Sequence, residues 1–286
     1  MAYPHRARFT DDHPKIFLNF DQVFKDIKVL GSGNFGETHL IEDIVDHTKY
    51  ALKMLFLKDK NDFYREVISL INLSKIPNCD PDIVCYYNHF ILPKNVYGTE
   101  FYCILMEYIP GVNLATFDES EQLSIKDIVR TGLWLLKTVG HLHKKGFAHN
   151  DITPGNIMVT KNMDLKLIDF GLTCFTIPNK NKYVKCKKDR LVNTTYASPE
   201  QKNGIYFTDV DRYSKTSDIY AIGLILYHLL TDSYPYELDK DGQIVSEYQD
   251  VRNKCMNIAL QNMLLINPDI RTDAEEAHLL LSKCLK

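Results

Sequence analysis

Three polar side chains near the middle of the chain have the types and the order that transfer of a phosphoryl group requires. Asp151, Asn156 and Asp169 lie in one short stretch of sequence, with apolar residues between them. A carboxylate can orient an attacking hydroxyl group and accept its proton, whereas carboxylate and amide oxygens are suitable ligands for Mg²⁺ on a polyphosphate. Each residue alone would be an ordinary turn or cap residue, but the ordered set predicts a base at Asp151 and metal ligands at Asn156 and Asp169.

Two short strands are expected to position these groups. Residues 157–159 and 165–168 are mainly apolar and flank a polar turn over 161–164, which is typical of a β-hairpin. Such a hairpin returns the chain towards its start. We therefore expect both metal ligands to lie at strand ends, close to each other.

The first third of the chain predicts an antiparallel sheet of about five strands with one helix. A glycine-rich turn over 31–36 separates two strand patterns. A strand rather than a helix follows this turn, which argues against a dinucleotide-binding fold. The later strands are expected over 50–55, 83–90 and 101–108, and the helix over 62–76.

Helical patterns dominate after residue 110. Ser124, with Asp127 three residues later, predicts a capped helix start, and Gly146 is expected to end that helix. Further helices are expected over 218–230, 251–265 and 272–285. Residues 1–20 have the composition of a mobile tail, so structure is expected to begin near Phe24. The chain is thus expected to form two lobes with a ligand cleft at their junction.

The bulk composition places the chain among ordinary globular proteins. At 286 residues, with 45% hydrophobic and 25% charged residues, it has ample material for a core. Its net charge of -3 gives no global basic surplus, so we expect no nucleic-acid partner. The longest apolar stretch is too short to cross a bilayer, so we expect no membrane span.

Seven cysteines are scattered along the chain without any C-x-x-C pair, which argues against a disulfide framework or a zinc site. A reducing compartment is the simpler interpretation. We therefore expect a cytoplasmic location, with the nucleus as a further option. For the oligomeric state we expect a monomer.

In this order, the motifs resemble those of the eukaryotic protein kinase family, from about Phe24 to the C-terminus. The resemblance implies an α+β, bilobal protein-kinase fold with ATP and Mg²⁺ as cofactors. It also implies protein substrates with serine or threonine hydroxyl groups, because Pro154 resembles the serine/threonine pattern. The implied parts are a tail over 1–23, an N-lobe over 24–107, a hinge over 108–113 and a C-lobe over 114–286.

The resemblance also implies a nucleotide site. Lys53 is expected to contact the α- and β-phosphates of ATP and to pair with Glu66 of the predicted helix. Met106 resembles the gatekeeper residue, and the backbone that follows it resembles the hinge that binds adenine. With Lys53 and Asp169, the residues implied to bind nucleotide are Leu30, Gly31, Ser32, Gly33, Asn34, Phe35, Gly36, Thr38, Ala51, Met106, Glu107, Ile109, Asn113 and Met158.

Residues 149–151, His-Asn-Asp, stand where the family has His-Arg-Asp. This correspondence makes Asp151 the base and His149 a packed core residue. Glu200 is implied to form a buried ion pair with Arg271, which lies far along the chain. In the same way, Asp218 is implied to anchor the backbone of the catalytic loop. A metal site formed by His141, His143, His149 and Asp151 is an alternative interpretation of the histidines.

Several residues depart from the family pattern. Asn150 replaces an arginine that a phosphate on the activation segment commonly neutralises, which predicts activity without an activating phosphate. Thr153 replaces a lysine, and Asn193 replaces a threonine, at positions that resemble those near the transferred phosphate. Thr38 replaces a valine that contacts adenine. These changes leave catalytic efficiency and substrate class open.

Three functions are compatible with these residues. The first is an ATP-dependent protein kinase. The second is a small-molecule kinase, because the catalytic loop also resembles that of choline kinases and aminoglycoside phosphotransferases. The third is a nucleotide-binding scaffold without catalysis. A basic cluster favours acidic or already phosphorylated substrates, or is an ordinary solvated charge run; its members are Lys180, Lys182, Lys185, Lys187, Lys188 and Arg190.

Overall fold

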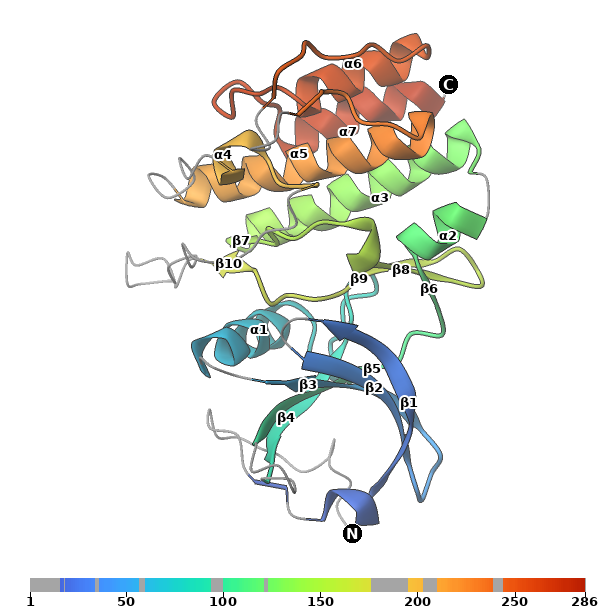
Figure 1. Cartoon of the computed structure of the whole chain (residues 1–286), viewed down its shortest axis with the longest axis vertical. Helices are drawn as coiled ribbons and strands as arrows, with labels where there is room; N and C mark the ends of the chain where they lie inside the picture. The colour runs from blue at the N-terminus through green and yellow to red at the C-terminus, as the bar shows by residue number, and fades with distance from the viewer. Residues whose placement is uncertain are drawn as a thin grey trace. The chain divides into compact units, whose positions relative to one another are not determined.

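A computed structural model of the chain describes residues 16–17, 19–33, 36–56, 60–93, 100–120, 123–175, 195–202, 210–238 and 244–285 (Figure 1). The chain divides into two compact units, Met1–Pro110 and Gly111–Lys286. The first unit is built on a sheet and the second mainly on helices, which agrees with the predicted α+β class.

The sheet of the first unit has five antiparallel strands in the order β1-β2-β3-β5-β4. This confirms the predicted sheet. The helix α1 spans Lys60–Leu73, so the predicted helix began and ended slightly too late. The strands are β1 (Phe24–Gly33), β2 (Gly36–Asp43), β3 (Lys49–Leu55), β4 (Tyr86–Leu92) and β5 (Phe101–Glu107).

Structure begins earlier than predicted. Ile16 forms a parallel bridge with Ile91, and the short helix η1 spans Phe20–Gln22. The prediction that structure begins near Phe24 was therefore wrong by several residues. Phe17 and Phe20 pack against one face of the sheet. This packing depends on the tertiary structure, and no local periodicity in the sequence predicts it.

The second unit contains a small sheet of three strands, in the order β6-β8-β9, and a two-stranded pair of β7 with β10. The hairpin of β8 with β9 confirms the strands predicted around the polar turn. The strands are β6 (Gly111–Asn113), β7 (Phe147–Ala148), β8 (Ile157–Thr160), β9 (Leu165–Leu167) and β10 (Cys174–Phe175), and the 3-10 helix η2 (Pro154–Asn156) precedes β8.

The helices of the second unit pack around α3 and α5, which lie side by side in Figure 1. Ser124 caps α3 as predicted, because its side chain accepts a hydrogen bond from the backbone N–H of Asp127. Asn253 and Asp273 cap α6 and α7 in the same way. The helices are α2 (Leu114–Ser120), α3 (Ile125–Lys144), α4 (Pro199–Lys202), α5 (Val210–Thr231), α6 (Lys254–Met263), α7 (Ala274–Ser282) and η4 (Lys283–Leu285).

The cysteines differ from the prediction. Disulfides join Cys255 to Cys284, with Cα atoms 5.5 Å apart, and Cys79 to Cys85, with Cα atoms 5.3 Å apart. The prediction against a disulfide framework was therefore wrong, because Cys255 and Cys284 meet only after α6 and η4 have packed together. The argument from cysteines for a reducing compartment loses its basis. The cytoplasmic location stays a prediction.

None of the helices in the described ranges is long and apolar enough to cross a membrane. The apolar helix α5 instead lies in the core of the second unit. Ile219, Ile222, Ile225 and Leu226 of this helix are all buried.

Candidate functional site

The loop over residues 149–151 of the second unit is held by one buried carboxylate. Asp218 Oδ2 accepts a hydrogen bond from the backbone N–H of His149 at 2.9 Å, and Asp218 Oδ1 accepts one from Asn150 N–H at 2.7 Å. His143 Nε2 lies 2.9 Å from Asp218 Oδ2 as a third donor. Because Asp218 projects from the rigid core helix α5, these bonds fix the backbone immediately before Asp151.

Both ring nitrogens of His149 are used inside the fold. Nε2 lies 3.2 Å from Ile168 O, while Nδ1 accepts a hydrogen bond from Asp151 N–H at 3.3 Å. The ring also meets Phe170 edge-on, with centroids 4.8 Å apart. His149 is therefore a packed residue that orients Asp151, and its nitrogens are committed to backbone groups.

Asp151 and Asn156 are in direct contact. Asn156 Nδ2 donates to Asp151 Oδ2 at 2.9 Å and also to the Asp151 backbone carbonyl at 2.9 Å. The two bonds orient the carboxylate of Asp151. They also turn the amide of Asn156 so that its oxygen, Oδ1, is the atom left for a metal ion.

Asp169 is joined to the same region through the backbone. Ile168 N–H donates to Asn156 O at 2.9 Å, so the end of the hairpin lies against the start of β8. Asp169 itself has a positive φ of 61°, and its Oδ1 accepts a hydrogen bond from Gly171 N–H at 3.1 Å. The amide oxygen of Asn156 and the carboxylate of Asp169 form a donor set of the kind that suits a hard divalent ion such as Mg²⁺.

Asn150 lies in the left-handed region, with φ of 64°. Asparagine tolerates this conformation better than most residues. Its Nδ2 lies 3.3 Å from Ala148 O and 3.4 Å from Leu172 O, so a neutral amide connects the loop over residues 149–151 to the segment that follows Asp169. This contact needs no phosphate to compensate a charge.

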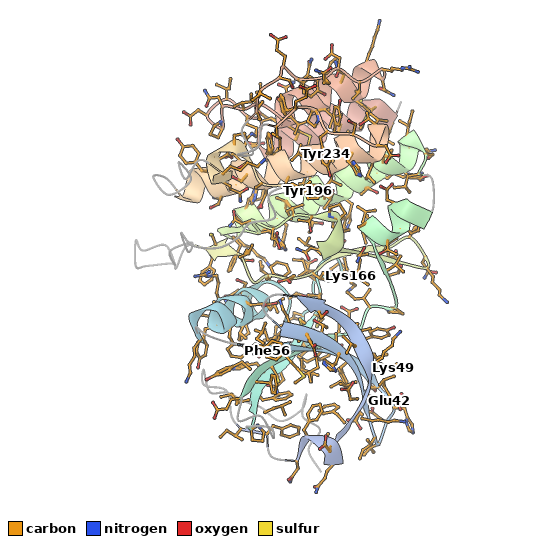
Figure 2. All side chains as sticks on the ribbon, viewed as in Figure 1. Glu42, Lys49, Phe56, Lys166, Tyr196 and Tyr234 are labelled. Atoms are coloured by element: carbon orange, nitrogen blue, oxygen red, sulfur yellow. A yellow bond between two sulfur atoms is a disulfide. The ribbon has the colours of Figure 1, made fainter. Side chains whose placement is uncertain are left out.

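A pocket lies beside Asp151 in the second unit. Thr153, two residues after Asp151, lines this pocket together with it. Tyr196, which precedes α4, and Gln201 of α4 also line the pocket. The ring centroids of Tyr196 and Tyr234 are 6.3 Å apart (Figure 2). The lining is Asn150, Asp151, Ile152, Thr153, Tyr196, Ala197, Gln201, Ser217, Asp218 and Ala221. Sequence reasoning missed Tyr196 and Gln201, because only the tertiary fold brings them beside the loop.

The predicted ion pair of Glu200 with Arg271 is present. Arg271 Nη1 lies 2.5 Å from Glu200 Oε1, and Nη2 lies 3.0 Å from Glu200 Oε2. Both side chains are almost completely buried, at 0% and 1% exposure. Ser217 Oγ donates to Glu200 Oε1 at 2.9 Å, which connects the pair to α5.

The first unit holds the predicted ammonium group. Lys53 Nζ donates to both carboxylate oxygens of Glu66, at 2.8 and 2.9 Å. The Lys53 side chain is 15% exposed and that of Glu66 is 3% exposed. Strand β3 and helix α1 thus hold a lysine in a fixed orientation with part of its surface accessible, as contact with a phosphate requires.

Replacing Lys53 with methionine is expected to lower kcat/KM for phosphate transfer by about 10²–10³-fold, the usual effect of removing one charged stabilising donor. Lys49→Met on the exposed start of the same strand is the matched control and should have no such effect. Steady-state transfer of labelled phosphate measures both variants. A Lys53→Met protein that retains full activity would contradict the assignment.

The predicted nucleotide residues occupy neighbouring strands within each unit. Ala51 pairs with Met106 across β3 and β5 in the first unit, and Asn113 pairs with Met158 across β6 and β8 in the second. Leu30 is 40% exposed on β1. Across the β1–β2 hairpin, Gly31 pairs with Thr38, Ser32 with Glu37 and Gly33 with Gly36. Glu107 is the last residue of β5, and Ile109 is buried. Asn34 and Phe35 lie outside the described residues.

The glycines of this hairpin differ in their surroundings. A Cβ atom at Gly31 or Gly33 would meet nothing within 4 Å, whereas one at Gly36 would lie 1.9 Å from Met54 O. Gly36 also has a φ of 155°. Glycine is thus required at Gly36 by the close passage of β3, and the open space at the other two is compatible with a close approach of phosphate.

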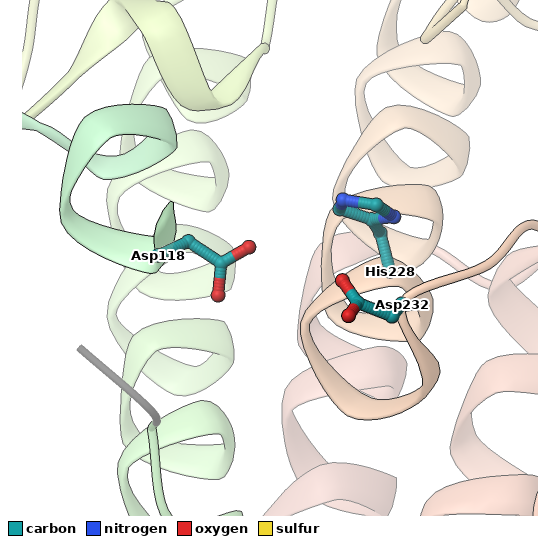
Figure 3. Close-up of side chains that lie close together, drawn as sticks. All are labelled: Asp118, His228 and Asp232. Atoms are coloured by element: carbon teal, nitrogen blue, oxygen red, sulfur yellow. The ribbon is translucent and has the colours of Figure 1, made fainter. Parts of the chain in front are cut away.

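The alternative metal site at the histidines is not formed in the described part of the chain. Among those residues, the one group of three or more histidine, cysteine, aspartate or glutamate side chains close enough to share a metal ion is Asp118, His228 and Asp232, whose ligand atoms lie within 4.8 Å of one another (Figure 3). His143 and His149 instead bond to Asp218 and to backbone groups. The basic cluster of the activation segment and Asn193 lie outside the described residues.

Comparison with known proteins agrees with this arrangement. The family model "Protein kinase domain" matches residues 24–286. The serine/threonine-protein kinase PrkC of Bacillus subtilis is 30% identical over 224 residues, which cover 74% of this chain and 31% of PrkC. The interferon-induced, double-stranded RNA-activated protein kinase of Rattus norvegicus is 29% identical over 276 residues, covering 90% of this chain and 51% of the relative.

The Rho-associated protein kinase let-502 of Caenorhabditis briggsae is 27% identical over 255 residues, which cover 85% of this chain and 19% of that protein. The chain thus spans between 19% and 51% of the length of these three relatives. The similarity therefore concerns the domain that carries the loop, the hairpin and the lysine described above.

Proposed function

This chain belongs to the protein kinase family, and we propose that it transfers the γ-phosphate of ATP to serine or threonine hydroxyl groups of protein substrates. The observation that carries the proposal is the catalytic loop: Asp218 anchors its backbone, and Asn156 orients the Asp151 carboxylate. A scaffold without catalysis has no chemical need for a carboxylate oriented in this way.

The residues divide the chemistry between them. Asp151 accepts the proton of the substrate hydroxyl as its oxygen attacks the γ-phosphorus, while the bond from this phosphorus to the bridging oxygen breaks and ADP leaves. Asn156 and Asp169 would hold Mg²⁺, which when bound supplies positive charge to the phosphate oxygens. Lys53, fixed by Glu66, holds the α- and β-phosphates. The substrate residue that carries the hydroxyl group lies with its oxygen beside the Asp151 carboxylate.

Incorporation of labelled phosphate from ATP tests this proposal. The wild-type chain is expected to label serine and threonine in generic protein substrates when Mg²⁺ is present, and to lose this labelling with EDTA. Choline and an aminoglycoside are the comparison substrates. Labelling of either small molecule in place of protein would overturn the proposal, as would nucleotide binding without any transfer.

We further propose that transfer does not depend on phosphorylation of the activation segment. Asn150 donates hydrogen bonds to Ala148 O and Leu172 O as a neutral group. This position therefore carries no positive charge that a phosphate would have to neutralise. Protein stripped with phosphatase is therefore expected to keep its initial rate within about twofold. The rate is measured before any new phosphate accumulates, with intact mass confirming the stripped state. A complete loss of activity on stripping would contradict the proposal.

A further inference from the structure

The sheet of the first unit has two different faces. Side chains alternate along a strand, so Ala51 and Lys53 of β3 point to one face, and Tyr50 and Leu52 point to the other. The first face carries the ion pair of Lys53 with Glu66 on α1. The second face carries a buried cluster of Phe24, Ile41, Tyr50, Leu52, Phe90, Cys103 and Leu105.

Residues that precede the matched kinase domain cover this second face. Phe17, Phe20 and Val23 pack against the buried cluster. We name residues 16–17 and 19–23 the N-terminal clamp. Helix η1 of the clamp is the short blue helix at the start of β1 in Figure 1.

The clamp is attached through its backbone to an edge strand. Strand β4 is the last strand in the sheet order, so its outer edge has unpaired backbone groups unless something covers it. Phe17 N–H donates to Ile91 O at 2.8 Å, and Ile16 forms a parallel bridge with Ile91. The clamp therefore covers part of this edge.

Aromatic rings extend the contact from the clamp to strand β3, which carries Ala51 and Lys53. Phe17 meets Phe90 of β4 with centroids 5.2 Å apart, and Phe20 meets Phe24 at 5.4 Å. Phe24 meets Tyr50 edge-on at 5.9 Å. Tyr50 directly precedes Ala51 in β3. A continuous chain of ring contacts thus leads from the clamp to the strand that carries Lys53. Each ring pair stabilises the packing beyond the effect of the apolar area that it buries.

We propose that the N-terminal clamp is a positioning element for the nucleotide half of the kinase site. Phe17 and Phe20 pack against the cluster that contains Tyr50 and Leu52 and thereby hold β3 in the position that presents Ala51 and Lys53. This proposal rests on the proposed function, because the position of Lys53 matters only if the chain binds ATP. The clamp acts through β3 and touches no reacting group.

The test uses the full chain with Phe17→Ala and Phe20→Ala combined. We expect the KM for ATP to rise roughly tenfold, because displaced binding groups lose orientation, while kcat stays within about twofold. Amide hydrogen exchange over 49–55 should become faster. Phe17→Leu with Phe20→Leu keeps most of the apolar volume and should restore most of the affinity for ATP.

Two controls separate positioning from general unfolding. Val45 is 66% exposed in the turn between β2 and β3, so Val45→Ala should change neither KM nor exchange. Trp134, the single tryptophan, lies in α3 of the second unit. Its fluorescence in the absence of urea therefore reports whether the second unit is folded in the alanine pair, and this signal should match that of the wild-type chain.

The outcomes are distinguishable. An unchanged KM for ATP and unchanged exchange over 49–55 in a folded alanine pair would overturn the clamp. If the alanine pair does not fold, Phe17→Ala alone takes its place, with the same comparison. If the wild-type chain neither binds ATP nor transfers phosphate, the proposed function has failed, and unchanged exchange over 49–55 would still overturn the clamp's hold on β3.

Discussion

Replacing Asp151 with asparagine is expected to lower kcat by about 10²–10⁴-fold, the usual contribution of a positioned general base. The amide oxygen of the new asparagine can still accept the hydrogen bond that Asp151 Oδ2 accepts from Asn156 Nδ2. The loop should thus keep its shape while losing the group that takes the proton. Steady-state transfer to a protein substrate measures the change, and KM for ATP should alter little.

The matched control for this variant is Asp164→Asn, in the exposed turn of the adjoining hairpin. It removes one carboxylate from the same unit and should leave kcat unchanged. Thermal melting of both variants shows whether the fold is intact. A folded Asp151→Asn protein with more than a tenth of the wild-type kcat would exclude Asp151 as the base.

Replacing Arg271 with methionine is expected to cost about 3–5 kcal/mol of the free energy of unfolding, because Glu200 then stays buried without a compensating charge. Arg271 also donates to Leu265 O at 2.9 Å and to Thr216 O at 2.9 Å, so these carbonyls lose a donor too. Urea unfolding followed by the fluorescence of Trp134, in the same unit, measures the loss.

A double-mutant cycle identifies the cause of this loss. Arg271→Met combined with Glu200→Gln should cost clearly less than the sum of the single changes, because the unpaired charge is gone. The exposed pair of Arg130 and Asp127 is the control, with side chains 60% and 38% exposed, and Arg130→Met should cost at most about 1 kcal/mol. Additive effects at Arg271 and Glu200 would argue that the two residues act independently.

Local signals accounted for most elements of the fold. The strands on both sides of the glycine-rich segment and the capped start of α3 were predicted correctly, because alternation and capping act between residues close in sequence. Helix ends were less accurate. The predicted start at residue 218 missed the first two turns of α5, which begins at Val210, because the polar residues there break the apolar pattern.

The candidate site was predicted by residue type and order, and its internal contacts were not. Asp151, Asn156 and Asp169 could be named from the chemistry that carboxylates and amides perform. The hydrogen bond from Asn156 to Asp151, the third donor to Asp218 from His143 and the pocket with Tyr196 depend on how segments pack. The assigned roles of these residues stay predictions until the variants are measured.

The sequence by itself determined the class of fold and the candidate acid, amide and lysine groups of the site, since each depends on residue identity and short spacing. Only the tertiary structure decided that Cys255 meets Cys284, that Phe17 and Phe20 cover the sheet, and that Tyr196 lies beside Asp151. The physical reason is that such contacts join residues far apart in the chain. Their formation depends on the summed packing of whole elements, and no local pattern encodes it.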